Sequence, residues 1–242
     1  MSKSGKKRKN TVKKIHSIAN ESAPTYYVES YKMLATNIEF IAVAQECKNI
    51  MITSSLESEG KTNCSVNLSL ALTGYGKKVC LVDCDLRRPS IHRLKRHPVG
   101  LTNVLKGEST LDDAVFRYQY QDKYLNVLLA GAIPPNPAEL LASKKMQKVI
   151  NELSERFDYI IYDTPPCLGI SDVSVLGRYM DAAILVVKHN STDKRIAERA
   201  KANLDNAGVK VIGAILSGYE KDSDVSDSYY YSCESYYGES DD

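Results

Sequence analysis

The chain has 242 residues, of which 43% are apolar and 26% are charged. This composition is typical of a globular protein and excludes fibrous, collagen-like and wholly disordered chains. The longest unbroken apolar run, residues 182–187, is far shorter than the ~20 residues that a membrane-spanning helix needs.

The net charge of +2 conceals two oppositely charged ends. Residues 1–16 carry seven Lys or Arg and no acid, whereas residues 219–242 carry eight Asp or Glu, one Lys and six tyrosines. The acidic end has too few apolar residues to offset the entropy of ordering. We therefore predict a flexible basic tail over 1–25, one folded domain over 26–218 and a disordered acidic tail over 219–242. The six cysteines include no CxxC pair, so we expect reduced thiols and a cytoplasmic protein.

The predicted elements begin with a helix over about 26–45, where apolar residues recur every three or four positions. Short runs rich in Val and Ile then alternate with segments of helical spacing. The expected strands are 48–54, 77–83, 124–129, 158–163, 181–187 and 209–216, and the expected helices are 60–74, 137–155, 170–179 and 192–206. This alternation predicts an α/β fold with a doubly wound, mostly parallel sheet, whose ligands bind at the carboxyl ends of the strands.

A phosphate-binding loop is indicated by the sequence SLESEGKT at residues 55–62, between a predicted strand and a predicted helix. Backbone N–H groups of such a loop and the positive end of the helix bind phosphates, Lys61 neutralises their charge, and Thr62 offers a hydroxyl to Mg²⁺. Ser55 stands where the usual loop has its first glycine. We expect ATP and Mg²⁺ as ligands. The candidate nucleotide-binding residues are Ser58, Glu59, Gly60, Lys61, Thr62 and Asn63.

Acidic residues follow two of the predicted buried strands. Asp83 and Asp85 end one strand two positions apart, so both point to the same side, and Asp163 ends another. Mg²⁺ is held by few carboxylates and keeps several waters. Thr62, Asp83 and Asp163 are therefore the expected metal-binding residues. Lys61, Asp83 and Asp85 are the expected catalytic residues, with either aspartate as the base that accepts a proton.

These motifs together resemble the bacterial tyrosine kinases that accompany capsular and exopolysaccharide synthesis. The resemblance rests on the phosphate loop, on DCDLRRP at 83–89, on DTPP at 163–166, on GAIPPNPAELL at 131–141 and on the acidic tyrosine cluster. It covers residues 26–242 and implies one P-loop domain related to the partitioning ATPases. In that family tail tyrosines accept the phosphate, which here implies Tyr229, Tyr230, Tyr231, Tyr236 and Tyr237.

The resemblance also implies partners. Relatives of this length work with a membrane-bound polysaccharide chain-length regulator that activates them at the inner face of the plasma membrane, and with a tyrosine phosphatase. The family's first helix carries Glu-x-x-Arg-x-x-Arg for self-association, and Glu29, Lys32 and Ala35 occupy those positions here. Lysine lacks the forked donors of arginine and alanine has none, which weakens the expected homo-oligomer. The basic N-terminus lacks interleaved aromatic residues, so no nucleic-acid partner is expected.

The predicted activity is ATP-dependent phosphorylation of tyrosines in the tail, in trans between subunits. Two other functions remain open at this point. One is a partitioning-type ATPase without kinase activity, although Leu56 stands where those proteins carry a signature lysine. The other is a non-catalytic regulator that binds nucleotide weakly, which the serines at 55, 58 and 217 would favour.

Overall fold

The computed structural model describes residues 15–219, and at 43–45 it describes the backbone only. The predicted tail from residue 220 onward, with its five candidate acceptor tyrosines, lies outside the described residues, as do residues 1–14.

The described chain forms a single seven-stranded sheet in the order β3-β4-β2-β5-β1-β6-β7. Its strands are β1 Asn49–Ser54, β2 Val79–Asp83, β3 Val115–Tyr120, β4 Lys123–Leu128, β5 Tyr159–Asp163, β6 Ala182–Lys188 and β7 Val211–Ser217. Only the β3–β4 pair is antiparallel, and all other neighbours run parallel. The predicted doubly wound, mostly parallel sheet is therefore confirmed.

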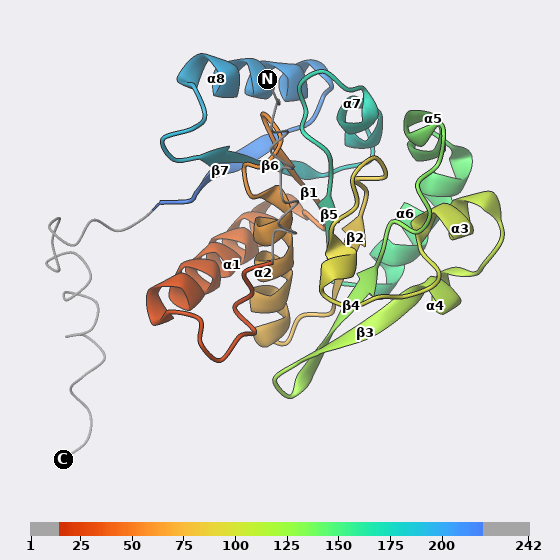
Figure 1. Cartoon of the computed structure of the whole chain (residues 1–242), viewed down its shortest axis with the longest axis horizontal. Helices are drawn as coiled ribbons and strands as arrows, with labels where there is room; N and C mark the ends of the chain where they lie inside the picture. Colours follow the sequence, from red (N-terminus) through yellow and green to blue (C-terminus); the bar gives the residue numbers. More distant parts are fainter. Residues whose placement is uncertain (1–14, 220–242) are drawn as a thin grey trace, which may run out of the picture.

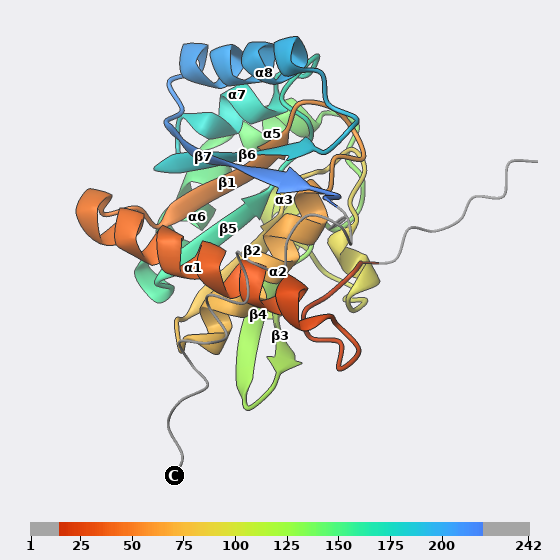
Figure 2. The same cartoon turned by 90° about the vertical axis from the view of Figure 1, so that its left-hand side faces the viewer.

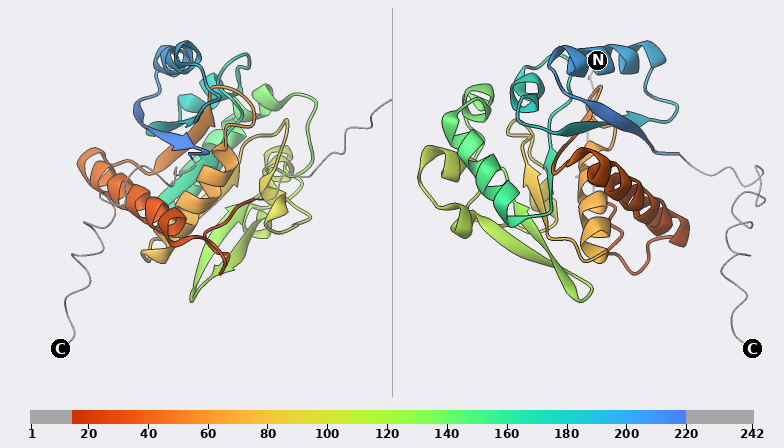
Figure 3. Two further views of the ribbon diagram at one scale, coloured as in Figure 1. Left: turned by 60° about the vertical axis from the view of Figure 1, so that its left-hand side comes forward. Right: turned by 180° about the vertical axis from the view of Figure 1, so that it is seen from behind.

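Helices cover both faces of the sheet (Figures 1 and 2). They are α1 Thr25–Gln45, α2 Lys61–Gly74, α3 Leu101–Lys106, α4 Leu111–Ala114, α5 Pro137–Leu141, α6 Lys144–Arg156, α7 Asp172–Gly177 and α8 Lys194–Asn206, with a short 3-10 turn at Ile91–Arg93. The helices α1 and α2 lie on one face, and α3 to α8 lie on the other. In the view from behind, the β3–β4 hairpin lies at one end of the molecule and α8 lies at the other (Figure 3).

The sheet separates two apolar cores, because successive side chains of a strand point to opposite faces. Ile50 and Ile52 of β1 pack toward α1 and α2, whereas Met51 packs toward the other helices. Every residue of β1, β2 and β5 is buried. Burial on both faces explains why these strands are continuous apolar runs in the sequence.

Several elements differ from the prediction, which also did not include the short helices α3 and α4. The expected helix 137–155 is two helices, because Ser143 has an extended backbone and its hydroxyl accepts the N–H of Met146 as the cap of α6. The strand β3 was not predicted. It is an edge strand of mixed polarity, and its pairing with β4 through a two-residue turn at Gln121 and Asp122 fixes it.

The folded region begins before residue 26, so the predicted boundary of the basic tail is wrong. Ile18 is buried against the core beneath α1, and its N–H donates to Oδ1 of Asn67 in α2 at 2.9 Å. The amide of Asn67 donates in turn to the carbonyl of His16 at 2.8 Å. Local sequence could not reveal this contact, because its partner lies about fifty positions away.

Within residues 15–219, no helix is long and apolar enough to cross a lipid bilayer. The five cysteines in this part of the chain are all buried and unbridged. Their thiols behave as small apolar groups.

Candidate active site

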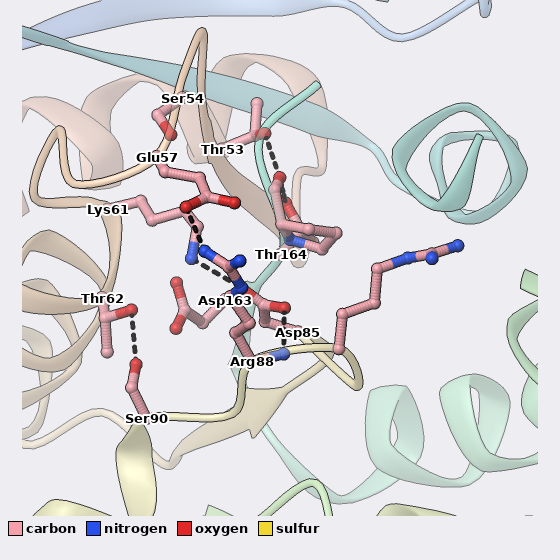
Figure 4. A network of polar contacts seen from close by, with 12 residues as sticks. Thr53, Ser54, Glu57, Lys61, Thr62, Asp85, Arg88, Ser90, Asp163 and Thr164 are labelled. Atoms are coloured by element: carbon pink, nitrogen blue, oxygen red, sulfur yellow. Dashed lines mark hydrogen bonds and ion pairs between the residues drawn. The ribbon is translucent and has the colours of Figure 1, made fainter. Parts of the chain in front are cut away.

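The predicted phosphate loop lies at the carboxyl edge of the sheet, between β1 and α2. The strand β5 lies between β1 and β2, and Asp83 and Asp163 are direct neighbours across the β2–β5 pair. Lys61 opens α2 beside them. The side chains of Lys61, Asp85 and Asp163 turn toward one another in Figure 4. The fold thus assembles the lysine and the three aspartates from separate parts of the chain.

The loop backbone takes conformations that favour glycine. Gly60 has φ +95°, and a Cβ placed there would lie 3.2 Å from Oγ of Ser217. Ser58 also has a positive φ of 65°, which costs an L-residue about 1–2 kcal/mol. The serine at 58, which departs from the usual loop sequence, therefore stores backbone strain at the site.

Side-chain contacts that sequence analysis did not predict hold the loop in place. The buried carboxylate of Glu59 accepts the N–H of Leu56 at 3.0 Å and the hydroxyl of Thr192. The hydroxyl of Ser217 donates to the carbonyl of Glu59. Glu59 was predicted to bind nucleotide, but its side chain is engaged within the protein, so only its backbone N–H can serve a phosphate. Thr192 precedes α8 and Ser217 ends β7, and because both are distant from the loop along the chain, no sequence pattern indicated these contacts.

The neighbouring carboxyls of Asp83 and Asp163 are both fully buried. Burial and the nearby Asp163 carboxylate raise the pKa of Asp83 to about 8. Burial also raises the pKa of Asp163, although the Lys61 ammonium opposes that shift. Asp83 accepts three backbone N–H groups, from residues 85, 90 and 91. These bonds fix its orientation and tie the segment after β2 to the site.

Lys61 forms an ion pair with Asp85, with 2.8 Å between Nζ and Oδ2. Burial disfavours the charged lysine, but the carboxylates of Asp163 and Asp85 outweigh it and raise the pKa of Lys61. The other Asp85 oxygen accepts the N–H of Arg88 at 3.0 Å. Lys61 is therefore a charged donor at the place where a phosphate would need one.

The carboxyl of Asp163 shows whether the site fits Mg²⁺ bound together with a nucleotide. Ser65 donates to its Oδ1 at 3.0 Å, whereas Oδ2 is buried and has no hydrogen-bond partner. Within residues 15–219, no three His, Cys, Asp or Glu side chains form a cluster that could hold a metal by themselves. Mg²⁺ usually takes one or two carboxylates together with phosphates and water. An unsatisfied carboxylate oxygen beside a phosphate loop fits that mode of binding.

Polar contacts hold the segment after β2 against α7, the phosphate loop and Thr62. The guanidinium of Arg87 binds the fully buried Asp172 of α7 through two bonds of 2.8 Å. The next residue, Arg88, forms an exposed ion pair with Glu57 of the phosphate loop. The hydroxyl of Ser90 donates to Oγ1 of Thr62 at 3.0 Å. The side chains of Arg87 and Arg88 are therefore both engaged in ion pairs.

Similarity to known proteins decides the family. A family model described as AAA domain matches residues 47–192. The Bacillus subtilis tyrosine-protein kinase YwqD is 40% identical over 204 residues, which cover 84% of this chain and 85% of that protein. The kinase domain of Escherichia coli Etk superimposes with a TM-score of 0.76 at 31% identity, covering 84% of this chain and 79% of that domain. The chain belongs to the bacterial tyrosine-protein kinases.

The kinase is also similar to partitioning ATPases, as its fold predicts. Pyrococcus horikoshii MinD, solved as a complex with Mg-ADP, has a TM-score of 0.60 and 28% identity, covering 73% of this chain and 72% of that one. The kinase spans 31% of the length of the full Escherichia coli etk protein, to which it is 30% identical. The expected fold, the expected family and tyrosine kinase activity are thereby confirmed.

The first helix of the kinase differs from the family pattern for self-association. Lys32 pairs with Glu29 at 2.8 Å on the surface. Ala35 is fully buried and packs against the core of its own domain. These two positions therefore present no arginine to a neighbouring subunit.

Proposed function

We propose that this kinase phosphorylates tyrosines of its own C-terminal tail, in trans, with Mg²⁺·ATP as phosphate donor. The proposed acceptors are Tyr229, Tyr230, Tyr231, Tyr236 and Tyr237. One observation carries the proposal. A charged lysine, a buried carboxylate oxygen without a partner and a carboxyl with a raised pKa lie at one edge of the sheet, beside a phosphate loop.

The proposed nucleotide site uses the loop from Ser58 to Asn63. Its backbone N–H groups and the start of α2 would bind the phosphates. The ammonium of Lys61 would exchange Asp85 for phosphate oxygens and neutralise the charge that develops during transfer. Thr62 and Asp163 would hold Mg²⁺ as expected, with Asp85 in place of the expected Asp83, and Mg²⁺ when bound neutralises further phosphate charge.

Asp83 is the proposed base, because its raised pKa keeps it a better proton acceptor than an ordinary aspartate. The phenolic oxygen of the acceptor tyrosine attacks the γ-phosphorus. The bond from that phosphorus to the oxygen bridging to the β-phosphate breaks, and its electron pair leaves with ADP. The phenolic proton passes to the Asp83 carboxylate. Of the two aspartates, Asp83 is proposed rather than Asp85 because Asp85 is paired with Lys61.

The proposed consequence of phosphorylation is release of the tail. Residues 219–242 already carry a formal charge of −7, and each phosphate adds about −1.5 to −2. Repulsion from the site aspartates then grows with each transfer. Unphosphorylated subunits would associate and phosphorylated subunits would separate.

The proposed cellular role is control of capsular or exopolysaccharide synthesis and export at the inner face of the plasma membrane. The expected activator is a membrane-bound polysaccharide chain-length regulator, and a tyrosine phosphatase would reverse the modification. The motifs shared with the capsule-associated kinases support this role. So does the similarity to the chimerical protein CapA2B2, with a TM-score of 0.75 at 27% identity.

Intact-mass spectrometry of the full chain after incubation with Mg²⁺·ATP tests the proposal. We expect successive additions of phosphate to the wild type. We expect none on Lys61→Met, and none on a variant with all five tail tyrosines changed to Phe. Phosphate release from ATP without any phosphotyrosine would contradict kinase activity and support a partitioning-type ATPase.

Transfer in trans is tested by mixing two full-length variants. The kinase with five Tyr→Phe changes supplies the active site, and Lys61→Met supplies the intact tail. Phosphate should appear on the Lys61→Met chain at a rate that rises with the concentration of the active variant. If only the wild type labels itself, at a rate independent of its concentration, the transfer is intramolecular.

A further inference from the structure

An apolar groove lies between α1 and the strand β7, on the face of the sheet opposite to α8. Its volume is about 410 Å³, within the range of small-ligand pockets, about 300–1,000 Å³. The residues that matter here are Leu34, Asn37 and Phe40 of α1 and Ile212, Gly213 and Ile215 of β7. The residues that line this α1–β7 groove lie outside the candidate active site, so it is a separate binding surface.

The backbone of β7 forms the floor of the groove. The pairing of β6 with β7 shifts register between Ala183 and Ile184, so that Ile212 is an extra residue on β7. Ile212 and Ile215 both pack toward the core beneath α1. Gly213 lies between them, and a Cβ placed on it would meet no atom within 4 Å. The missing side chain at Gly213 therefore contributes to the empty space.

The lining of the groove suits a neutral tyrosine and excludes a phosphorylated one. The ring of Phe40 is 74% exposed at the groove, and an exposed ring beside apolar walls favours contact with a second aromatic ring. The amide of Asn37 is the one polar side chain among the described lining residues, and it can bond a phenolic hydroxyl. Those residues include no Lys, Arg or His. A phosphate placed there would lose its water without gaining a positive partner.

The strand β7 can also accept an additional extended segment. It is the last strand of the sheet that residues 15–219 form, so its outer N–H and C=O groups have no neighbouring strand there (Figure 2). Its seven residues carry no charge, although charged side chains are a usual protection of an edge strand. A segment that pairs with this edge can place alternate side chains in the groove.

Lysines flank the path that such a segment would follow. Lys188 pairs with Ser217 at one end of β7, and the exposed Lys210 precedes the other end. Residues 219–242 carry a formal charge of −7, with acids on both sides of their tyrosines. Opposite charges at the two ends of the groove favour an acidic segment whose centre is aromatic.

The tail of the same chain begins beside the groove and is long enough to enter it. The strand β7 ends at Ser217, and the described residues end at Tyr219. A segment that returns along β7 from Ser217 to Ile212 covers about 17 Å, at ~3.3 Å per residue. Tyr229 follows Tyr219 by ten residues, which can span about 33–36 Å when extended. The tyrosines at 229–231 can therefore reach the groove of their own chain.

We propose that the α1–β7 groove holds an unphosphorylated tyrosine of the chain's own C-terminal tail and thereby keeps that tail from the active site of a second copy. The inference rests on the proposed function and adds an autoinhibitory contact to it. The occupant is the ring of one of the tyrosines at 229–231, with its hydroxyl bonded to the amide of Asn37. Once that tyrosine is phosphorylated, the groove no longer accepts it, so the tail stays released until the phosphate is removed.

Phosphate transfer between two full-length variants tests the autoinhibitory contact. The enzyme is the kinase with its five tail tyrosines changed to Phe, and the acceptor is the Lys61→Met chain. Gly213→Val in the acceptor fills the groove, because the added Cβ meets no atom and the φ of Gly213 lies outside the left-handed region. Valine also suits a strand. The initial rate of phosphorylation of the acceptor should rise roughly threefold or more, and an unchanged or lower rate would overturn the proposal.

Two controls separate this contact from other effects of the substitution. Ala202→Leu adds apolar volume to the acceptor at an exposed position of α8, on the other face of the sheet, and should leave the rate unchanged. Equal increases in the two acceptor variants would refute a role for the groove. Gly213→Val in the enzyme chain should also leave the rate unchanged. If the rate changes only with that placement, the groove binds the tail of the second copy and the assignment to the same chain is wrong.

Hydrogen exchange measures the occupancy of the groove without any phosphate transfer. The full-length wild type is compared with a full-length variant in which the five tail tyrosines are changed to Ser, both without nucleotide. Backbone amides of residues 211–217 should exchange at least threefold faster in the Ser variant, and equally fast in the wild type after its tail has been phosphorylated. Equal exchange in the two unphosphorylated proteins would overturn the proposal. Protection that grows with protein concentration would also overturn it, because a second copy would then cover the groove.

Failure of the proposed function has a different result. The wild type would then take up no phosphate from Mg²⁺·ATP. The comparison of hydrogen exchange between the wild type and the Ser variant would still show whether the tail occupies the groove.

Discussion

Replacing Asp83 with Asn should stabilise the nucleotide-free kinase at neutral pH while it abolishes phosphate transfer. Asp83 is completely buried next to Asp163, and its pKa is raised from 3.8 to about 8. A carboxyl with a raised pKa in the folded state favours folding while it is protonated. That contribution is complete below pH 3.8, declines as the pH rises, and is lost above about 8.

The size of the effect follows from the two pKa values of Asp83. At pH 7.5 a shift from 3.8 to about 8 destabilises the folded state by up to about 5 kcal/mol, at 1.36 kcal/mol per pKa unit. Asn cannot accept as many hydrogen bonds at the atom that receives the N–H groups of Ser90 and Ile91, and that loss costs about 1–2 kcal/mol. The net gain is therefore about 3 kcal/mol at pH 7.5. At pH 5 the charge term falls to about 2 kcal/mol and the two effects nearly cancel.

Urea unfolding of the two proteins at pH 5 and pH 7.5, without nucleotide or Mg²⁺, measures this difference. The free energy of unfolding of Asp83→Asn relative to the wild type should increase by about 3 kcal/mol between the two pH values. Asp205→Asn, which removes an exposed carboxylate paired with Lys201, should change stability by less than about 0.5 kcal/mol at both. A difference between Asp83→Asn and the wild type that does not vary with pH would refute the account of a buried, repelled carboxyl.

Three further predictions concern the loop, the segment after β2 and the base. Ser58→Gly should stabilise the kinase by about 0.5–1 kcal/mol in thermal unfolding, because glycine adopts the positive φ at this position without strain; a loss of stability would show that the serine side chain contributes to the loop. Arg87→Ala leaves the buried Asp172 carboxylate without its partner and should cost about 2 kcal/mol in urea unfolding, whereas Arg88→Ala should cost less than about 1 kcal/mol because its ion pair is exposed; equal costs would contradict this distinction. The kcat/KM for the acceptor should rise with pH between 6 and 9, because the raised pKa of Asp83 keeps part of the base protonated near neutrality; a flat profile would remove Asp83 from that role.

Much of the fold was predictable because its central strands β1, β2 and β5 are buried on both faces. Continuous runs such as 159–163 and 182–187 have one structural interpretation in an alternating α/β pattern. The hairpin strand β3 was not predictable in the same way. Its polarity is that of a half-exposed edge, and its pairing partner rather than its own sequence makes it a strand. The same holds for Ile18, whose burial depends on the distant α2.

The features of the site also fall into those that the sequence predicted and those that it did not. Sequence identified Lys61, Thr62 and the three aspartates, because a phosphate loop and strand-end acids follow local patterns. Sequence did not show that Glu59 is engaged by Thr192, that Lys61 pairs with Asp85, or that Asp83 adjoins a cavity. Each of these facts joins segments that only the assembled sheet brings together.

The amino-acid sequence by itself determined the α/β architecture, the phosphate loop and the kinase motifs, because periodicity and short-range spacing encode them. Only the tertiary structure decided that the pKa of Asp83 is raised and that Lys61 forms its ion pair with Asp85. It also placed a cavity beside Asp83. Burial and charge proximity are properties of the packed chain, and they change the protonation of a side chain without leaving any pattern in its neighbours along the sequence.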